Sequence, residues 1–93
     1  MFKVSLSFLA LKELEDAHDW YESKEVNLGL RFLDEFEETL TVIKHMPHFA
    51  VRYDKVRCIP VKKFPYLIHY QLFPRKKLIL VVAVFHTSRK PKK

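Results

Sequence analysis

Cysteine and glycine are almost absent from this 93-residue chain, which has one of each. The single cysteine, Cys58, cannot form an internal disulfide, and no cysteine and histidine cluster has the spacing of a zinc site. One glycine is too few for the glycine-rich loops that cradle nucleotide phosphates. We therefore expect no metal and no other cofactor, and nucleotide-binding loops of the common types are excluded.

Long hydrophobic runs are missing as well. The longest apolar segment, residues 78–85, is far shorter than the roughly 20 residues that a membrane-spanning helix needs. The apolar stretch at the start is short and is interrupted by Lys3 and Lys12, so no signal peptide is visible. We expect a single domain over residues 1–93 that is soluble, cytoplasmic and without a membrane partner.

Acidic residues are scarce in one half of the chain. Residues 1–47 carry ten Asp or Glu against five Lys or Arg, whereas residues 48–93 carry only Asp54 against twelve bases. Folding does not require like charges to be concentrated in this way. A positive surface attracts polyanions and acidic partners, so we interpret the basic half as functional.

The acidic half begins with a predicted strand and continues as a helix. Residues 2–6 alternate apolar and polar side chains, which is typical of a strand with one buried face. Ser5 or Ser7 can then cap a helix, because a serine hydroxyl accepts hydrogen bonds from unpaired amides of the first turn. Apolar side chains follow at helical spacing from Leu11 to Tyr21.

A second helix is predicted after a short connection at residues 23–27, with Asn27 as its candidate cap. Apolar residues recur four positions apart from Leu28 to about His45. Pro47 disfavours helical geometry at the residue before it and ends this pattern. The short connection implies that the two helices form an antiparallel pair.

The basic half is rich in β-branched and aromatic residues, which favour strands. The predicted strands are residues 51–53, 56–64, 66–73 and 78–86, with a turn at residues 74–77.

Three further features place side chains within the predicted sheet. Residues 78–85 are apolar on both faces, which predicts a central strand. Pro60 lacks an N–H donor, which predicts an edge position or a bulge. Alternation places Tyr70 in the core and leaves His69 on the polar face.

The order of elements predicts an α+β fold. We expect an N-terminal strand and an antiparallel two-helix hairpin packed on one face of a mostly antiparallel sheet of four to five strands. Phe32, Phe36 and Leu40 would cover that face. The other face, its rim and a basic tail at residues 88–93 would carry the exposed cations.

The candidate site residues lie in this basic half. The candidates for binding a target or a nucleic acid are Arg57, Lys62, Lys63, His69 and Arg89. If the protein is a nuclease, His86 is the candidate proton donor or acceptor and Arg89 would stabilise charge on the scissile phosphate. A structural role for His86 is an equal alternative, and Cys58 fits a small core residue better than a nucleophile.

Two segments resemble the RelE/ParE toxin superfamily. Residues 57–70 contain an arginine, a Phe-Pro-Tyr and then an apolar-x-Tyr, as its central strands often do. Residues 81–91 are similar to its terminal strand with the signature H-x-x-R-x-P. Upstream, Trp20-Tyr21 and Pro47 fall where that family places residues of its helix pair and the proline that follows. The resemblance covers nearly the whole chain and implies one toxin domain over residues 1–93.

The resemblance implies a toxin of a bacterial type II toxin–antitoxin system, neutralised by a cognate antitoxin protein. A ParE-like toxin would inhibit growth by poisoning DNA gyrase. A RelE-like toxin would cut mRNA on the ribosome, with His86 in place of the tyrosine that the last strand lacks. A third alternative is an inactive toxin-like module that binds its antitoxin, and operator DNA only within that complex. We favour the ParE-like alternative, and whether the chain is an enzyme stays open at this stage.

Overall fold

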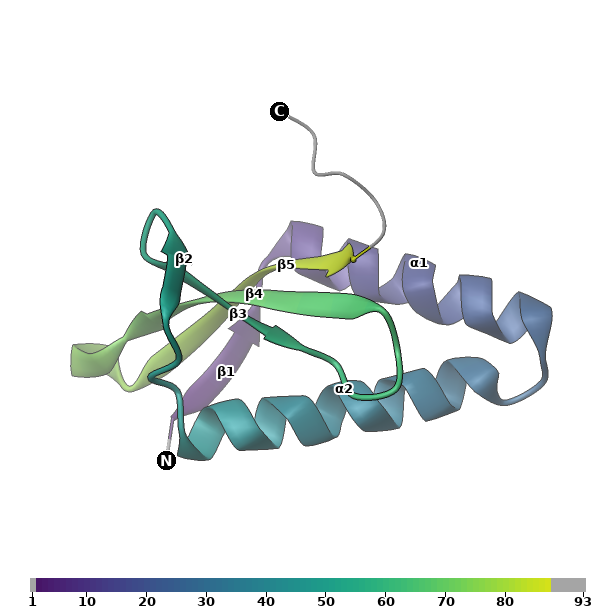
Figure 1. Cartoon of the computed structure of the whole chain (residues 1–93), viewed down its shortest axis with the longest axis horizontal. Coiled ribbons are helices and arrows are strands. Elements are labelled where there is room, and N and C mark those ends of the chain that lie inside the picture. The colour runs from purple at the N-terminus through teal and green to yellow at the C-terminus, as the bar shows by residue number, and fades with distance from the viewer. Residues whose placement is uncertain (1, 88–93) are drawn as a thin grey trace.

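The computed structural model describes residues 2–87 and places two helices on one side of a five-stranded sheet (Figure 1). The elements are β1 (Lys3–Leu6), α1 (Phe8–Lys24), α2 (Leu28–His45), β2 (Val51–Tyr53), β3 (Val56–Pro60), β4 (Tyr66–Phe73), a 3₁₀ turn (Pro74–Lys76) and β5 (Leu78–His86). The strand order is β1-β5-β4-β3-β2, with β1 parallel to β5 and the other neighbours antiparallel. The predicted α+β fold is confirmed.

α1 begins at the predicted serine cap. Ser7 Oγ accepts a hydrogen bond from the Ala10 N–H at 3.0 Å, and the hydroxyl donates to the Val82 carbonyl at 3.2 Å. One side chain therefore starts the helix and ties it to β5. No helix within residues 2–87 is both long enough and apolar enough to cross a bilayer.

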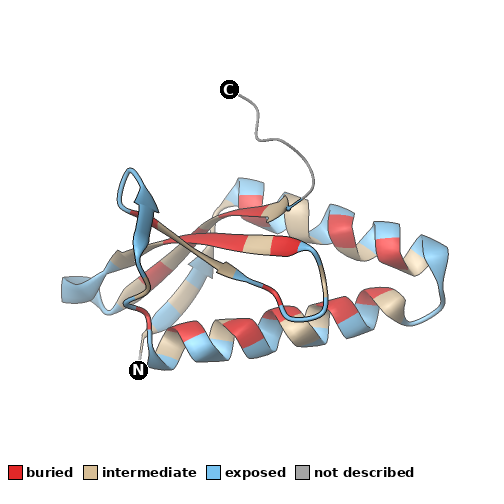
Figure 2. Ribbon diagram, viewed as in Figure 1, coloured by how far each residue is buried: buried red, intermediate tan, exposed pale blue. Residues whose placement is uncertain are grey.

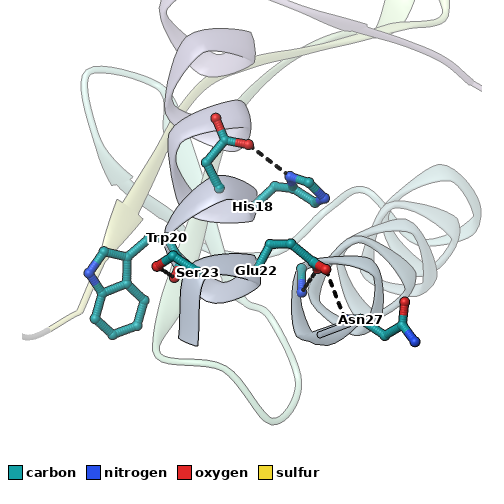
Figure 3. Close-up of polar contacts among 7 residues, drawn as sticks. His18, Trp20, Glu22, Ser23 and Asn27 are labelled. Atoms are coloured by element: carbon teal, nitrogen blue, oxygen red, sulfur yellow. Dashed lines mark hydrogen bonds and ion pairs between the residues drawn. The ribbon is translucent and has the colours of Figure 1, made fainter. Parts of the chain in front are cut away.

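α2 begins in a way that the sequence did not predict. Asn27 occupies the cap position with a left-handed φ of 70°, but its side chain makes no capping bond. The Glu22 carboxylate of α1 accepts instead from the N–H groups of Asn27 and Gly29, at 2.9 and 3.0 Å (Figure 3). The prediction of Asn27 as a capping side chain is wrong because the neighbouring helix supplies the acceptor.

Gly29 allows the two helices to approach closely. A Cβ atom added at Gly29 would lie 2.7 Å from the backbone oxygen of His18 and 2.7 Å from its ring carbon Cδ2. The single glycine of the chain therefore has a packing role, and it does not form a turn. α2 ends at His45, two residues before Pro47, as predicted.

The core lies between the helices and the sheet (Figure 2). Its largest fully buried side chains are Tyr70, Phe32, Ile43, Ile68, Ile79 and Val81. The Tyr70 hydroxyl donates to the Pro47 carbonyl at 2.8 Å, which fastens the segment after α2 to the central strand β4. The packing role predicted for Tyr70 is confirmed.

β3 is shorter than predicted. It ends at Pro60, and Lys62 and Lys63 lie in a turn, where Lys63 has a φ of 71°. Pro60 lies beyond the part of β3 that pairs with β2, which agrees with the predicted edge position. β5 was predicted as a central strand; it lies between β1 and β4, in the interior of the sheet, and β4 is the middle strand of the five.

Candidate functional site

His69 lies in a buried cluster on the sheet face opposite the helices. Its Nδ1 is 2.9 Å from the Tyr53 hydroxyl and 3.5 Å from Cys58 Sγ, and its ring meets Phe85 edge-on with centroids 4.8 Å apart. The side chain is only 8% exposed. The expectation that His69 lies on an exposed polar face is therefore wrong, because Tyr53 of the short edge strand β2 covers it.

The ionisable groups of this cluster are held neutral. Burial, and then the charge of Arg52, lowers the pKa of His69 below its ordinary value of 6.5. Burial raises the pKa of Tyr53 above 10.0, with Cys58 and Asp54 adding to the effect. Burial also raises the pKa of the Cys58 thiol above 9.0, against the opposing charge of Arg52. At neutral pH the cluster therefore offers neither a histidine cation for a phosphate nor a reactive thiolate.

Arg57 lies on the other face of the sheet from His69. It pairs with Tyr70 across β3 and β4, and side chains of cross-strand partners share a face. Its Nε donates to the Phe49 carbonyl at 2.8 Å, which binds it to the segment between α2 and β2. Arg57 and His69 therefore cannot contact one ligand atom together.

Lys62 and Lys63 lie in the turn between β3 and β4. Both side chains are exposed, and Lys63 Nζ is 3.3 Å from Glu35 Oε2 of α2. The nearby Thr87 N–H donates to the Pro65 carbonyl at 2.7 Å, so this turn and the end of β5 lie at the same end of the sheet.

His86 is the last residue of β5 and stands opposite Tyr66, with ring centroids 5.0 Å apart. Tyr66 is four residues from Tyr70 along β4, which at about 3.3 Å per residue places His86 roughly 13 Å from the level of Arg57. The structure thus gathers the lysine turn and His86 at one end of the sheet and leaves Arg57 and His69 elsewhere. Arg89 lies outside the described residues, as does the rest of the predicted tail 88–93.

Glu13 is a residue with a defined role that the sequence did not reveal. Its Oε1 accepts a hydrogen bond from the Val84 N–H of β5 at 2.7 Å, beyond the part of β5 that β1 covers. Burial raises the pKa of Glu13. The hydrogen bond from Val84 acts in the opposite direction, and the negative charge of Asp16 raises the pKa further. Nothing in the local pattern distinguishes Glu13 from the other acids of α1, since its partner is far away in the sequence.

Comparison with known proteins agrees with this architecture. The family model described as the ParE toxin of the type II toxin–antitoxin system parDE matches residues 4–91. No curated protein matches the chain by sequence.

Solved structures of similar fold come from two toxin–antitoxin systems. A chain of the chromosomal ParDE toxin–antitoxin system from P. aeruginosa superposes with a TM-score of 0.77 at 15% identity, covering 95% of this chain and 98% of that one. A chain of the intact E. coli RelBE toxin–antitoxin complex superposes with a TM-score of 0.67 at 17% identity, and the match covers 96% of this chain and 100% of that one. The isolated E. coli RelE toxin superposes with a TM-score of 0.67 at 16% identity, and the match covers 97% of this chain and 88% of that one. At these identities the likeness is one of fold.

Proposed function

The chain belongs to the ParE toxin family of type II toxin–antitoxin systems, and we propose that it inhibits bacterial growth by binding and poisoning DNA gyrase. The observation that carries the proposal is the family match over residues 4–91, almost the whole chain. A cognate antitoxin would neutralise it, and operator DNA would be contacted only within that complex. The similar folds in the ParDE and RelBE systems support the antitoxin partner. Gyrase acts in the bacterial cytoplasm, so the protein would act there too.

The positions of the candidate residues favour a toxin that acts by occupying its target. A nuclease needs its proton-transfer group and its cations within hydrogen-bond reach of one phosphate. His86 and Arg57 are separated along the sheet, and His69 lies on the face opposite Arg57. A protein that works by binding needs only a contiguous surface, so this arrangement does not impair it.

The start of α1 offers apolar anchors for such a surface. Phe8, Leu9 and Leu11 are 84%, 54% and 45% exposed. Neighbouring exposed apolar side chains are typical of surfaces that bind other proteins. We therefore include the start of α1 among the contacts to a target.

A gyrase supercoiling assay tests this proposal directly. The purified chain should block supercoiling of relaxed plasmid and should cause cleaved DNA to accumulate, and His86→Ala should retain both effects. Absence of inhibition at every concentration would refute gyrase as the target.

The RelE-like alternative makes a different prediction for the same variant. The similar fold of the RelE toxin keeps mRNA cleavage on the ribosome as the second candidate function. In that case His86→Ala would abolish cleavage of ribosome-bound mRNA while thermal unfolding stays unchanged. Induction in a bacterial host separates all cases: filamentation with DNA damage indicates gyrase, an immediate stop of translation indicates the ribosome, and harmless expression indicates an inactive module.

A further inference from the structure

A groove of about 370 Å³ runs between α2 and the free end of β3. Its lining consists of Glu35, Glu38, Thr39 and Val42 from α2 and of Ile59, Pro60, Val61 and Lys62 from β3 and the turn after it. β2 pairs with β3 only at Val56 and Arg57, so within residues 2–87 no strand covers the outer edge of β3 further on. The turn after β3 descends to α2 (Figure 1), where Lys63 pairs with Glu35.

Glu35 lines this groove, and one of its carboxylate oxygens is buried and unpaired among residues 2–87. Its side chain is 15% exposed, and Oε2 lies 3.3 Å from Lys63 Nζ. Oε1 is buried, and no residue among 2–87 donates a hydrogen bond to it. The Thr39 hydroxyl is already used, because it donates to the Glu35 backbone carbonyl at 2.9 Å.

An unpaired buried carboxylate oxygen reduces the stability of a fold, and such groups are few in native proteins, so each one calls for an explanation. The surrounding sequence strengthens the negative charge, since four of residues 34–38 are acidic. The floor of the groove is apolar, with Val42 being 46% exposed and Ile59 half-buried. The groove thus combines a carboxylate with one unpaired oxygen and an apolar surface that no strand of residues 2–87 covers.

We propose that this groove binds a segment of a partner protein through an arginine that pairs with Glu35, next to an apolar side chain that packs on Val42 and Ile59. Arginine fits because its planar guanidinium can donate to Glu35 and also to Glu38, which lies one turn further along α2. The exposed Lys62 at the rim can keep its ammonium group in solvent.

This surface has the opposite chemistry to the basic sheet, where acidic partners would bind. The protein would then have a second interaction surface, in which Glu35 and Glu38 bind a cationic side chain. The inference needs neither His86 nor Arg57. Lys62 and Lys63 do border the groove, so its test reads peptide binding and does not depend on inhibition of gyrase. A failure of gyrase inhibition would therefore leave it intact.

Titration of the ¹⁵N-labelled full chain with short peptides tests this proposal. The probe is an acetylated and amidated Leu-Arg-Val-Leu peptide, and its control has citrulline in place of arginine, with the same shape and no charge. We expect saturable amide shifts at Val42, Val61 and Lys62, and affinity about tenfold or more lower for the citrulline peptide. Glu35→Gln should reduce the affinity for the arginine peptide by a similar factor. Glu15→Gln, an exposed acid of α1, should leave it unchanged.

Several results would overturn the proposal. They are equal affinity for the two peptides, unchanged affinity in Glu35→Gln, or shifts confined to the sheet. If the amide shifts of groove residues changed with protein concentration in the absence of peptide, the groove would be assigned to a second copy of the chain. A carbodiimide cross-link from Glu35 to a lysine of residues 90–93 would assign it to the chain's own terminus.

Discussion

The pH dependence of the free energy of unfolding tests whether His69 is buried and neutral in the folded protein. The pKa of folded His69 is lowered from 6.5 because burial, and secondly the charge of Arg52, disfavours the imidazolium. As the pH falls, the unfolded chain therefore takes up this proton before the folded protein does. The stability contributed by the neutral ring is complete above pH 6.5 and is lost as the pH falls from there through the folded pKa.

The size of the effect follows from proton linkage. Between the two pKa values, the free energy of unfolding falls by up to about 1.4 kcal/mol per pH unit. For a domain of this size, each kcal/mol lowers Tm by about 4–8 °C. Glu13 acts with the opposite sign, since its raised pKa means that protonation as the pH falls towards 4.5 favours the folded state. A comparison of variants therefore isolates His69 better than one acid titration does.

Urea unfolding of wild type and His69→Asn between about pH 7.5 and about pH 5 provides this comparison. The amide oxygen of asparagine can accept the hydrogen bond from the Tyr53 hydroxyl in place of His69 Nδ1, and the asparagine side chain does not titrate. We expect the wild type to lose stability below pH 6.5 to a degree that the variant does not. His48→Asn changes an exposed histidine and should follow the wild type. Parallel curves for wild type and His69→Asn would refute the reasoning.

Three packing predictions follow from single contacts. Gly29→Ala places a Cβ 2.7 Å from the His18 carbonyl oxygen. This substitution should lower the free energy of unfolding by about 1–3 kcal/mol, although alanine has the better helix propensity. An unchanged Tm would contradict this prediction. Tyr70→Phe removes the buried 2.8 Å bond to the Pro47 carbonyl and should lower the free energy of unfolding by about 1–3 kcal/mol in urea. Ser7→Ala removes the cap of α1 and the bond to β5 and should cost about 1 kcal/mol, read by thermal unfolding.

The elements that the sequence predicted are those with a clear period or a local stop signal. The spacing of apolar residues located α2, and Pro47 located its end. The turn after β3 was missed because Val61 and Phe64 have strand propensity and no glycine marks the bend. Lys63 adopts the left-handed conformation with a φ of 71° instead, where its side chain reaches Glu35. A lysine in this conformation gives no turn signal in the sequence, because positive φ is expected of glycine, asparagine or aspartate.

The candidate site was harder to predict than the fold. Alternation along β4 correctly placed His69 on the opposite face from Tyr70. It could not show whether that face is covered, because this depends on Tyr53 of β2, a strand of three residues. Strand register likewise decides that Arg57 stands opposite Tyr70 and not opposite Tyr66, and register cannot be read from one sequence.

The contacts of the cationic residues bear on how the toxin acts. Arg57 is bound to the Phe49 carbonyl and Lys63 is paired with Glu35. To join His86, Arg57 would have to leave its partner and reach roughly 13 Å along the sheet. The exposed Lys62 and Lys63 already lie at the end of the sheet where His86 stands, and the ion pair of the exposed Lys63 side chain costs little to break. A binding surface requires no such movement, since each cation can meet an acidic group of the target where it stands. The contacts of Arg57 therefore fit a binding surface better than a site built around His86.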